Sequence, residues 1–204
     1  LPPQTATGND MDTYASDVNE LTTHLGLKNA IHIGHSTGGG EALRFAAKYG
    51  SNGRVDKVVL ISAITPYMIK DENNPDGVPK QVFDDIRFNT AHNRQQFYQD
   101  LAIPFYGYNR EGANIKKGIQ DNWWRQGMMG GIKAHYDCIE VFSETNFTED
   151  LKSIQLPVLV LHGDDDQIVP YATTAVKAAE LLKNSKLIIY PGFPHGMPTT
   201  EAEI

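Results

Sequence analysis

Four short apolar runs recur along the chain, and each predicts a buried β-strand. Every run is rich in β-branched residues and lacks the polar alternation of a half-exposed strand. The runs are Ala30 to Ile33, Val58 to Ile61, Val158 to Leu161 and Leu187 to Tyr190. Because strands of this composition are usually buried on both sides, we expect both faces of their sheet to be covered.

Helical patterns separate these runs. The first helix has Asp12 as its expected N-cap and ends near Gly26. The second runs from about Gly38 to Tyr49 and is closed by Gly50, and the third covers Tyr171 to Leu182. The alternation of strand and helix predicts parallel pairing with right-handed crossovers, so the fold class is α/β.

The stretch from residue 66 to residue 154 interrupts this alternation, because it shows helical patterns and no convincing strand. An excursion of this length between two strands is far beyond an ordinary connection. We therefore predict a partial α/β core at residues 1–65 and 155–204, and a helical cap insertion at residues 66–154. A simple packing domain is the alternative. The insertion is rich in aromatic residues: Phe83, Phe88, Phe97, Phe105, Tyr106, Tyr108, Trp123, Trp124, Tyr136 and Phe142.

The first apolar run leads directly into the sequence Gly-His-Ser-Thr-Gly at Gly34 to Gly38, which opens the second helix. A Gly-x-Ser-x-Gly segment between a strand and a helix is typical of a nucleophile elbow, a strained turn that exposes a serine hydroxyl. We expect side chains at Gly34 and Gly38 to collide with neighbouring backbone. Ser36 is therefore the predicted nucleophile.

A serine hydroxyl needs a base to remove its proton, so the prediction requires a histidine later in the chain. Of the seven histidines, His195 follows the last apolar run in a Gly-Phe-Pro-His-Gly loop, at the edge of the sheet where Ser36 lies. His35 is interpreted as a buried support. The remaining histidines are interpreted as packing or surface residues: His24, His32, His92, His135 and His162.

The predicted acid lies in the loop Gly-Asp-Asp-Asp-Gln-Ile-Val-Pro, which follows the third apolar run. Its pattern Gly-x-x-Asp-x-x-Val-Pro selects Asp166. Asp164 and Asp165 are then turn and helix-entry residues that face solvent. The resulting chain order of serine, aspartate and histidine is the one used by α/β-hydrolases.

Composition excludes several classes of partner and site. A formal net charge of -7 without any Lys/Arg run argues against nucleic acid and anionic membranes. Cys138 is the only cysteine, so neither a disulfide framework nor a thiolate metal site is expected. The polar opening stretch Leu1 to Asn9 reads as a turn and lacks the regions of a signal peptide, and no apolar run is long enough to span a membrane. We expect a cytoplasmic protein.

Several segments beyond these loops carry a family resemblance. They are Gly34 to Gly40, Pro104 to Gly107, Asn122 to Gly127, His162 to Pro170 and Pro194 to Gly196. With them the chain resembles, over essentially its whole length, the bacterial α/β-hydrolases called non-haem chloroperoxidases or perhydrolases, which are similar to small aryl esterases. The resemblance implies an α/β-hydrolase fold with a mostly parallel sheet.

The resemblance also implies hydrolysis of carboxylic esters with aryl or short-chain acyl groups, through an acyl-enzyme on Ser36. On the same resemblance, hydrogen peroxide would replace water to give a peracid, and halogenation would be secondary chemistry of that peracid, with no cofactor and no metal. The partners are then a small ester or carboxylic acid and peroxide; a homo-oligomer is left open. The backbone N–H of Thr37 would bind the oxyanion, and Tyr67, Met68 and Ile168 would line the acyl pocket.

Family members begin with several further strands and a His-Gly-Trp type of loop that supplies a second oxyanion donor. We expect this donor, and the last helix, to lie outside the 204 residues. The strand at Ala30 to Ile33 would then be an exposed apolar edge, prone to aggregation. An isolated piece of this kind is expected to have little activity.

Two other functions stay open at this stage. A non-catalytic ligand-binding member of the fold would bind a small apolar molecule without reacting at Ser36, since a fold does not dictate chemistry. A hydrolase of lactones or of carbon–carbon bonds would keep the same three residues. A halide-displacing enzyme is disfavoured, because that reaction uses an aspartate where Ser36 stands.

Overall fold

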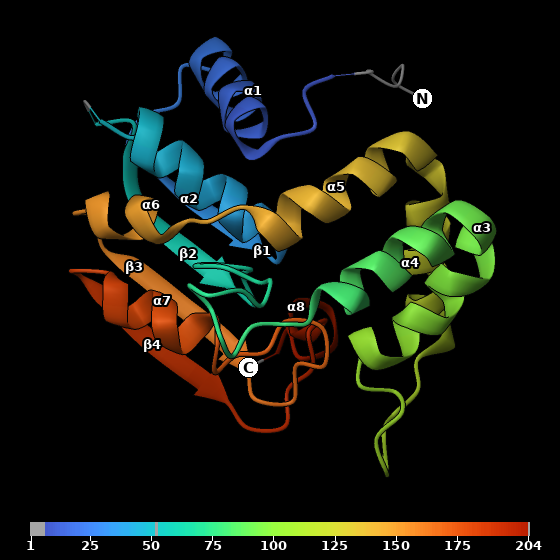
Figure 1. Ribbon diagram of the computed structural model, residues 1–204. Coiled ribbons are helices and arrows are strands. Elements are labelled where there is room, and N and C mark those ends of the chain that lie inside the picture. The colour runs from blue at the N-terminus through green and yellow to red at the C-terminus, as the bar shows by residue number, and fades with distance from the viewer. Residues whose placement is uncertain (1–6, 52, 204) are drawn as a thin grey trace.

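A parallel sheet of four strands forms the centre of the protein (Figure 1). The structure is a computed structural model that describes residues 7–51 and 53–203; residues 1–6 of the predicted opening turn lie outside that range. The strands pair in the order β1-β2-β3-β4, and every neighbouring pair is parallel. All four predicted strands are therefore confirmed, with bounds β1 (Ala30–His35), β2 (Val55–Ile61), β3 (Val158–Gly163) and β4 (Ser185–Tyr190).

One layer of helices covers one face of this sheet. Helix α2 (Thr37–Tyr49) packs on β1 and β2, and α7 (Ala175–Leu181) packs on β3 and β4. The layer is completed by α1 (Met11–His24), which lies on α2, and by α6 (Thr148–Ser153), which lies between α2 and α7. Strand residues that point into this layer, such as Val58 and Leu60, are fully buried.

The opposite face of the sheet differs from the prediction that both faces are covered. Ile31 and Ile33 of β1 point to that face and are 54% and 65% exposed. The physical reason is that, within the described residues, the helices packed on the sheet all lie on the other side. As predicted, β1 is an edge strand with apolar side chains exposed to solvent.

Two predicted helix starts are corrected. The N-cap of α1 is Asp10, whose Oδ1 accepts the backbone N–H of Thr13 at 2.8 Å, whereas Asp12 lies in the first turn and pairs with Arg44 and Lys48. The last predicted helix begins at Ala175 rather than Tyr171, because residues 171–174 form turns. The second helix, closed by Gly50, is confirmed to within one residue.

The segment between β2 and β3 is helical and makes no strand of the sheet within the described residues. Its long helix α3 bends at Asn93, whose side chain accepts the N–H of Gln96, and α3 packs against both α4 and α5. These helices form a group beside the arrowhead end of the strands (Figure 1). Their bounds are α3 (Lys80–Phe105), α4 (Lys117–Met129) and α5 (Ile132–Glu144). The division of the chain at residues 66 and 154 stays a prediction.

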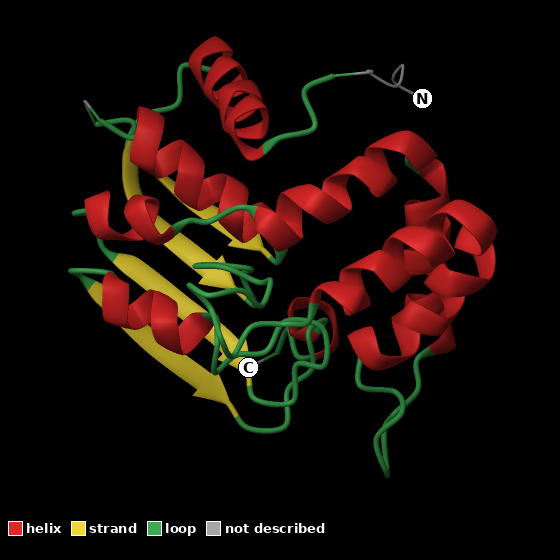
Figure 2. Cartoon of the chain, in the orientation of Figure 1, coloured by secondary structure: helices red, strands yellow, loops and turns green. Residues whose placement is uncertain are grey.

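The arrangement brings the loops that follow the strands to one place. Because the strands are parallel, all their carboxyl ends meet at one edge of the sheet. Figure 2 shows these loops clustered between the sheet and the helices α3, α4 and α5, which are called the cap below together with the loops that join them. The short helix α8 (Met197–Thr200) follows the last of these loops. Residues far apart in the sequence therefore meet at this edge.

The N-cap of α1 can be tested by substitution. Asp10→Ala should lower the free energy of unfolding by about 1 kcal/mol, because the N–H of Thr13 loses its acceptor. Asp10→Asn keeps a capping oxygen and should stay within a few tenths of a kcal/mol of the wild type. Urea unfolding followed by circular dichroism measures both. Equal losses in the two variants would show that the charge, and not the cap, stabilises this end.

Candidate active site

Ser36 lies in a sharp turn between β1 and α2. Its backbone has φ 55° and ψ -123°, a left-handed conformation that costs free energy in a residue other than glycine. The turn is held by a hydrogen bond from Ser36 N–H to the carbonyl of Ile61 at 3.0 Å, and by one from Gly39 N–H to the carbonyl of Ser36 at 3.0 Å. An observed strain of this kind points to a functional residue.

The two glycines that flank Ser36 are not equivalent. A Cβ at Gly34 would lie 2.1 Å from the carbonyl oxygen of Gly38, so only glycine fits there. At Gly38 an added Cβ meets no atom within 4 Å among the described residues outside its chain neighbours and the backbone of its own helix. The predicted collision therefore holds at Gly34 and is wrong at Gly38, where the chain turns away into α2.

The structure brings His195 and Asp166 into direct contact at the edge of the sheet. His195 Nδ1 lies 2.7 Å from Asp166 Oδ2, and both side chains are fully buried. The loop after β4 carries His195 and the loop after β3 carries Asp166. A neutral imidazole that donates Nδ1–H to a carboxylate keeps the lone pair of Nε2 for accepting a proton.

Asp166 is held by hydrogen bonds on both carboxylate oxygens. Oδ1 accepts the backbone N–H groups of Ile168 at 2.9 Å and Val169 at 2.8 Å, while Oδ2 faces His195 and also His162 Nε2 at 3.1 Å. Burial alone would raise the pKa of Asp166, but the hydrogen bonds from the two histidines and the loop hold that pKa well below its usual range. Asp166 is therefore a carboxylate at neutral pH.

Ser36 and His195 line one cavity of about 650 Å³. His195 Nε2 is buried and, within the described part of the chain, has no hydrogen-bond partner, Ser36 included. In a structure without substrate, a loose serine–histidine contact is common and tightens when substrate binds. The geometry thus places the half-buried Ser36 and the unpartnered Nε2 of His195 on the lining of the same cavity.

Thr37 is the first residue of α2 and also lines this cavity. Its N–H lies at the helix N-terminus, where backbone donors have no acceptor within the helix and the helix dipole favours negative charge. The position suits a group that binds an oxyanion formed at Ser36.

The predicted pocket residues divide into two groups. Met68 and Ile168 line the cavity, among apolar side chains from the sheet loops and the cap helices. Tyr67 does not belong to that lining, because its hydroxyl instead donates to Asp71 Oδ2 at 2.9 Å. The cap supplies further lining residues to which the sequence analysis gave no individual role in the pocket, namely Phe105, Trp123 and Gln126.

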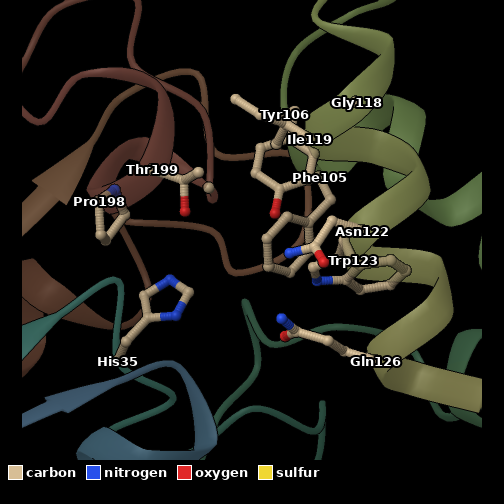
Figure 3. Close-up of a pocket in the computed structure, with 11 residues that line it drawn as sticks. His35, Phe105, Tyr106, Gly118, Ile119, Asn122, Trp123, Gln126, Pro198 and Thr199 are labelled. Atoms are coloured by element: carbon tan, nitrogen blue, oxygen red, sulfur yellow. The ribbon is translucent and has the colours of Figure 1, made fainter. Parts of the chain in front are cut away.

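A second cavity of about 430 Å³ adjoins the first and is more polar in its lining residues. Figure 3 shows His35 and Thr199 on one side of it and Asn122 and Gln126 on the other. The ring of Phe105 borders both cavities and contacts His195 edge-on, with ring centroids 4.8 Å apart. The ring of His195 is thus covered on the cap side by the aromatic ring of Phe105.

His35 supports the loop that carries the candidate base. Its Nε2 donates to the carbonyl oxygen of His195 at 2.9 Å, and the two rings lie 4.8 Å apart. Burial, followed by the nearby His195, lowers the pKa of His35 to about 4, so the ring is neutral at neutral pH. The predicted role of a buried support agrees with these contacts.

Three neighbouring residues have roles that the sequence pattern did not predict. Asp164 accepts the N–H of Gly192 at 2.6 Å, and Asp165 pairs with Arg110 of the cap at 2.5 Å, so neither simply faces solvent. His162, interpreted as a packing residue, contacts the carboxylate of Asp166. The sequence shows only that His162 lies four residues before Asp166 at the end of a strand, which does not indicate whether the two side chains meet.

The described residues contain no group of three or more His, Cys, Asp or Glu side chains placed to hold a metal ion. In the same part of the chain, no helix has the length and hydropathy needed to cross a membrane.

Comparison with known proteins supports the fold. A sequence profile described as the alpha/beta hydrolase fold matches residues 2–201. The chain is 60% identical over 197 residues to a bifunctional esterase/perhydrolase of Acinetobacter calcoaceticus, covering 96% of this chain and 71% of that one. It is 58% identical to a non-heme chloroperoxidase of Streptomyces lividans, with 98% and 73% covered. The crystal structure of a bromoperoxidase from Bacillus anthracis superposes with a TM-score of 0.94 at 31% identity, over 98% of this chain and 73% of that one.

The asymmetry of the two glycines is testable. Gly34→Ala should lower the free energy of unfolding by about 3 kcal/mol or more and abolish reaction at Ser36, because its Cβ has no room beside Gly38. Gly38→Ala is the matched control and should fold and react like the wild type. Urea unfolding and fluorophosphonate labelling of Ser36 measure the two effects. Wild-type stability and labelling in Gly34→Ala would mean that the turn can shift to make room for the added Cβ.

The lowered pKa of His35 predicts a dependence of stability on pH. Below about pH 6.5 the unfolded chain protonates His35, whereas the folded protein does so only near pH 4, so stability falls as the pH drops through this window. The loss attributable to His35 is at most about 3 kcal/mol. His35→Gln keeps an N–H donor and should flatten this part of the profile.

Urea unfolding between pH 4 and 7 measures this effect. His24→Gln is the control for the substitution itself, because it replaces an exposed histidine and leaves the buried His35 in place. If the free energy of unfolding fell equally with pH in the wild type and in His35→Gln, a neutral, buried His35 would be contradicted.

Proposed function

The chain belongs to the α/β-hydrolase family, and on that basis we propose that Ser36, His195 and Asp166 act together in the hydrolysis of carboxylic esters. The observation that carries the proposal is the state of His195. Its Nδ1 is bound to a buried carboxylate at 2.7 Å while its Nε2 is free beside the cavity lined by Ser36. A base oriented in this way activates a serine hydroxyl.

In the first half of the reaction, Ser36 Oγ forms a bond to the ester carbonyl carbon and passes its proton to His195 Nε2. The carbonyl oxygen becomes an oxyanion, which the N–H of Thr37 stabilises at the start of α2. The imidazolium is stabilised by Asp166, which remains a carboxylate because its pKa is held low. His195 then gives the proton to the departing alcohol, and an acyl-enzyme remains on Ser36.

In the second half, water or hydrogen peroxide attacks the carbonyl carbon of the acyl-enzyme, and His195 Nε2 takes the proton of the attacking molecule. The bond between that carbon and Ser36 Oγ then breaks, and His195 returns the proton to Ser36 Oγ. Water gives the carboxylic acid, and peroxide gives the peracid, with Ser36 regenerated in both cases. The peracid then transfers oxygen to a halide ion, which yields the carboxylic acid and a hypohalite. Relatives named as an esterase/perhydrolase and as a non-heme chloroperoxidase support both outcomes.

The cavity supports a small ester with an apolar acyl or aryl group. Its volume of about 650 Å³ lies within the ordinary range for small-molecule sites. Ile64, Met68 and Phe142 belong to its mostly apolar lining, and Ser36 and His195 supply polar groups where the reacting carbonyl would lie. Burial of an apolar group there would hold the ester carbonyl near Ser36.

The proposal is tested with 4-nitrophenyl acetate hydrolysis and peroxide-dependent bromination by the complete gene product. Ser36→Ala should lower kcat for both reactions by roughly 10⁴-fold or more, because both pass through the same acyl-enzyme. Asp166→Asn should lower kcat by about 10⁴-fold, since an amide can favour the wrong tautomer of His195.

Asp165→Asn is the matched control, because it changes a neighbouring carboxylate that contacts only Arg110 in the described structure. Its activity should stay within about threefold of the wild type. Unchanged activity in Ser36→Ala would reject the proposal. Loss of hydrolysis with full retention of bromination would show that peroxide reacts elsewhere in the protein.

A further inference from the structure

His162 is a second imidazole on the carboxylate of Asp166. It lies at the end of β3, and its side chain is fully buried. Its Nε2 lies 3.1 Å from Asp166 Oδ2 and 2.9 Å from the carbonyl oxygen of Val169. The same Oδ2 receives His195 Nδ1 at 2.7 Å, so one carboxylate oxygen lies between two histidines.

The hydrogen-bond partners determine the tautomer of His162. A backbone carbonyl only accepts, so Nε2 must carry a hydrogen, which it shares between Val169 and Asp166. Nδ1 is buried and has no partner within the described residues, so a hydrogen there would have no acceptor. His162 is therefore a neutral ring with Nε2–H directed at the carboxylate.

We propose that His162 is a positioning residue for the reaction, which holds Asp166 Oδ2 against His195 Nδ1. The proposal rests on the proposed function of Ser36, His195 and Asp166. The first contribution of His162 is geometric. Its Nε2–H is shared between the carboxylate of Asp166 and the backbone carbonyl of Val169, which lies in the same loop as Asp166. This loop then keeps Oδ2 in line with His195 through the proton transfers.

The second contribution concerns the charge of Asp166. A buried carboxylate with too few hydrogen-bond donors takes up a proton. The protonated acid can itself donate to Nδ1 of His195, so it no longer favours the tautomer with a hydrogen on Nδ1. Oδ1 already has two backbone donors. Oδ2 would have His195 as its only donor, and His162 supplies a second one. His162 thereby favours the His195 tautomer that leaves Nε2 free for Ser36.

The alternative is that His162 only fills space in the core. Glutamine and methionine separate the two roles, because both side chains are similar in length and volume while only glutamine carries an N–H donor. If His162 positions Asp166, His162→Met should lower kcat by about 10- to 100-fold and leave KM within about twofold. His162→Gln should restore kcat to within about threefold of the wild type. Equal kcat values in the two variants would overturn the proposal.

A fluorophosphonate titration of Ser36 counts the competent sites in each preparation, so that kcat is expressed per folded molecule. The titration and the hydrolysis rate of the wild type test the proposed function independently of the role of His162. If the wild type neither labels nor hydrolyses esters, the proposed function fails. If the wild type is active and His162→Met is too, only the role of His162 is lost.

A measurement on the unaltered protein covers the case in which His162→Met does not fold. ¹⁵N NMR of histidine-labelled protein should show His162 with a protonated Nε2 and a bare Nδ1. The proton between His195 and Asp166 should give a downfield resonance in the wild type and in His162→Gln. A protonated Nδ1 on His162, or loss of that resonance in His162→Gln, would overturn the assignment.

Discussion

The buried carboxylate of Asp166 is the group on which the rest of the site depends. A charge without access to water must be met by donors, and here two backbone N–H groups and two imidazoles meet it. Those donors come from the loop after β3, the end of β3 and the loop after β4. Satisfying the charge therefore fixes the positions of both loops relative to the sheet, and with them the orientation of His195.

The sheet supplies the second constraint, which acts on Ser36. Parallel strands place all their carboxyl ends at one edge, so the turn after β1 faces the loops after β3 and β4. The strained backbone of Ser36 is tolerated because Gly34 lets the chain pass within contact distance of Gly38, and because the backbone is tied to Ile61. Rigid secondary structure on both sides of the turn holds a conformation that an isolated peptide would not keep.

The cap contributes the surroundings of the reacting groups. Phe105 packs its ring against His195, and Arg110 pairs with Asp165 beside the candidate acid. His35 adds support from the sheet side, through the carbonyl of His195. These contacts enclose the imidazole, and electrostatic interactions in such an enclosed site are stronger than in water. An ester bound there would react away from most of the solvent.

The sequence by itself determined the strands, their parallel pairing and the identities of Ser36, Asp166 and His195 as candidates. It could do so because apolar runs, a glycine-flanked serine and loop patterns are local signals with a direct physical basis. Tertiary structure decided what depends on contacts between distant segments. Three features depend on which residues of distant segments lie nearby. They are the exposure of one face of the sheet within the described residues, the hydrogen bond of Tyr67 to Asp71 and the space around Gly38. The contact of His162 with Asp166 could not be predicted either, because a spacing of four residues at the end of a strand does not show whether two side chains meet. The conformation of the loop after the strand brings them together.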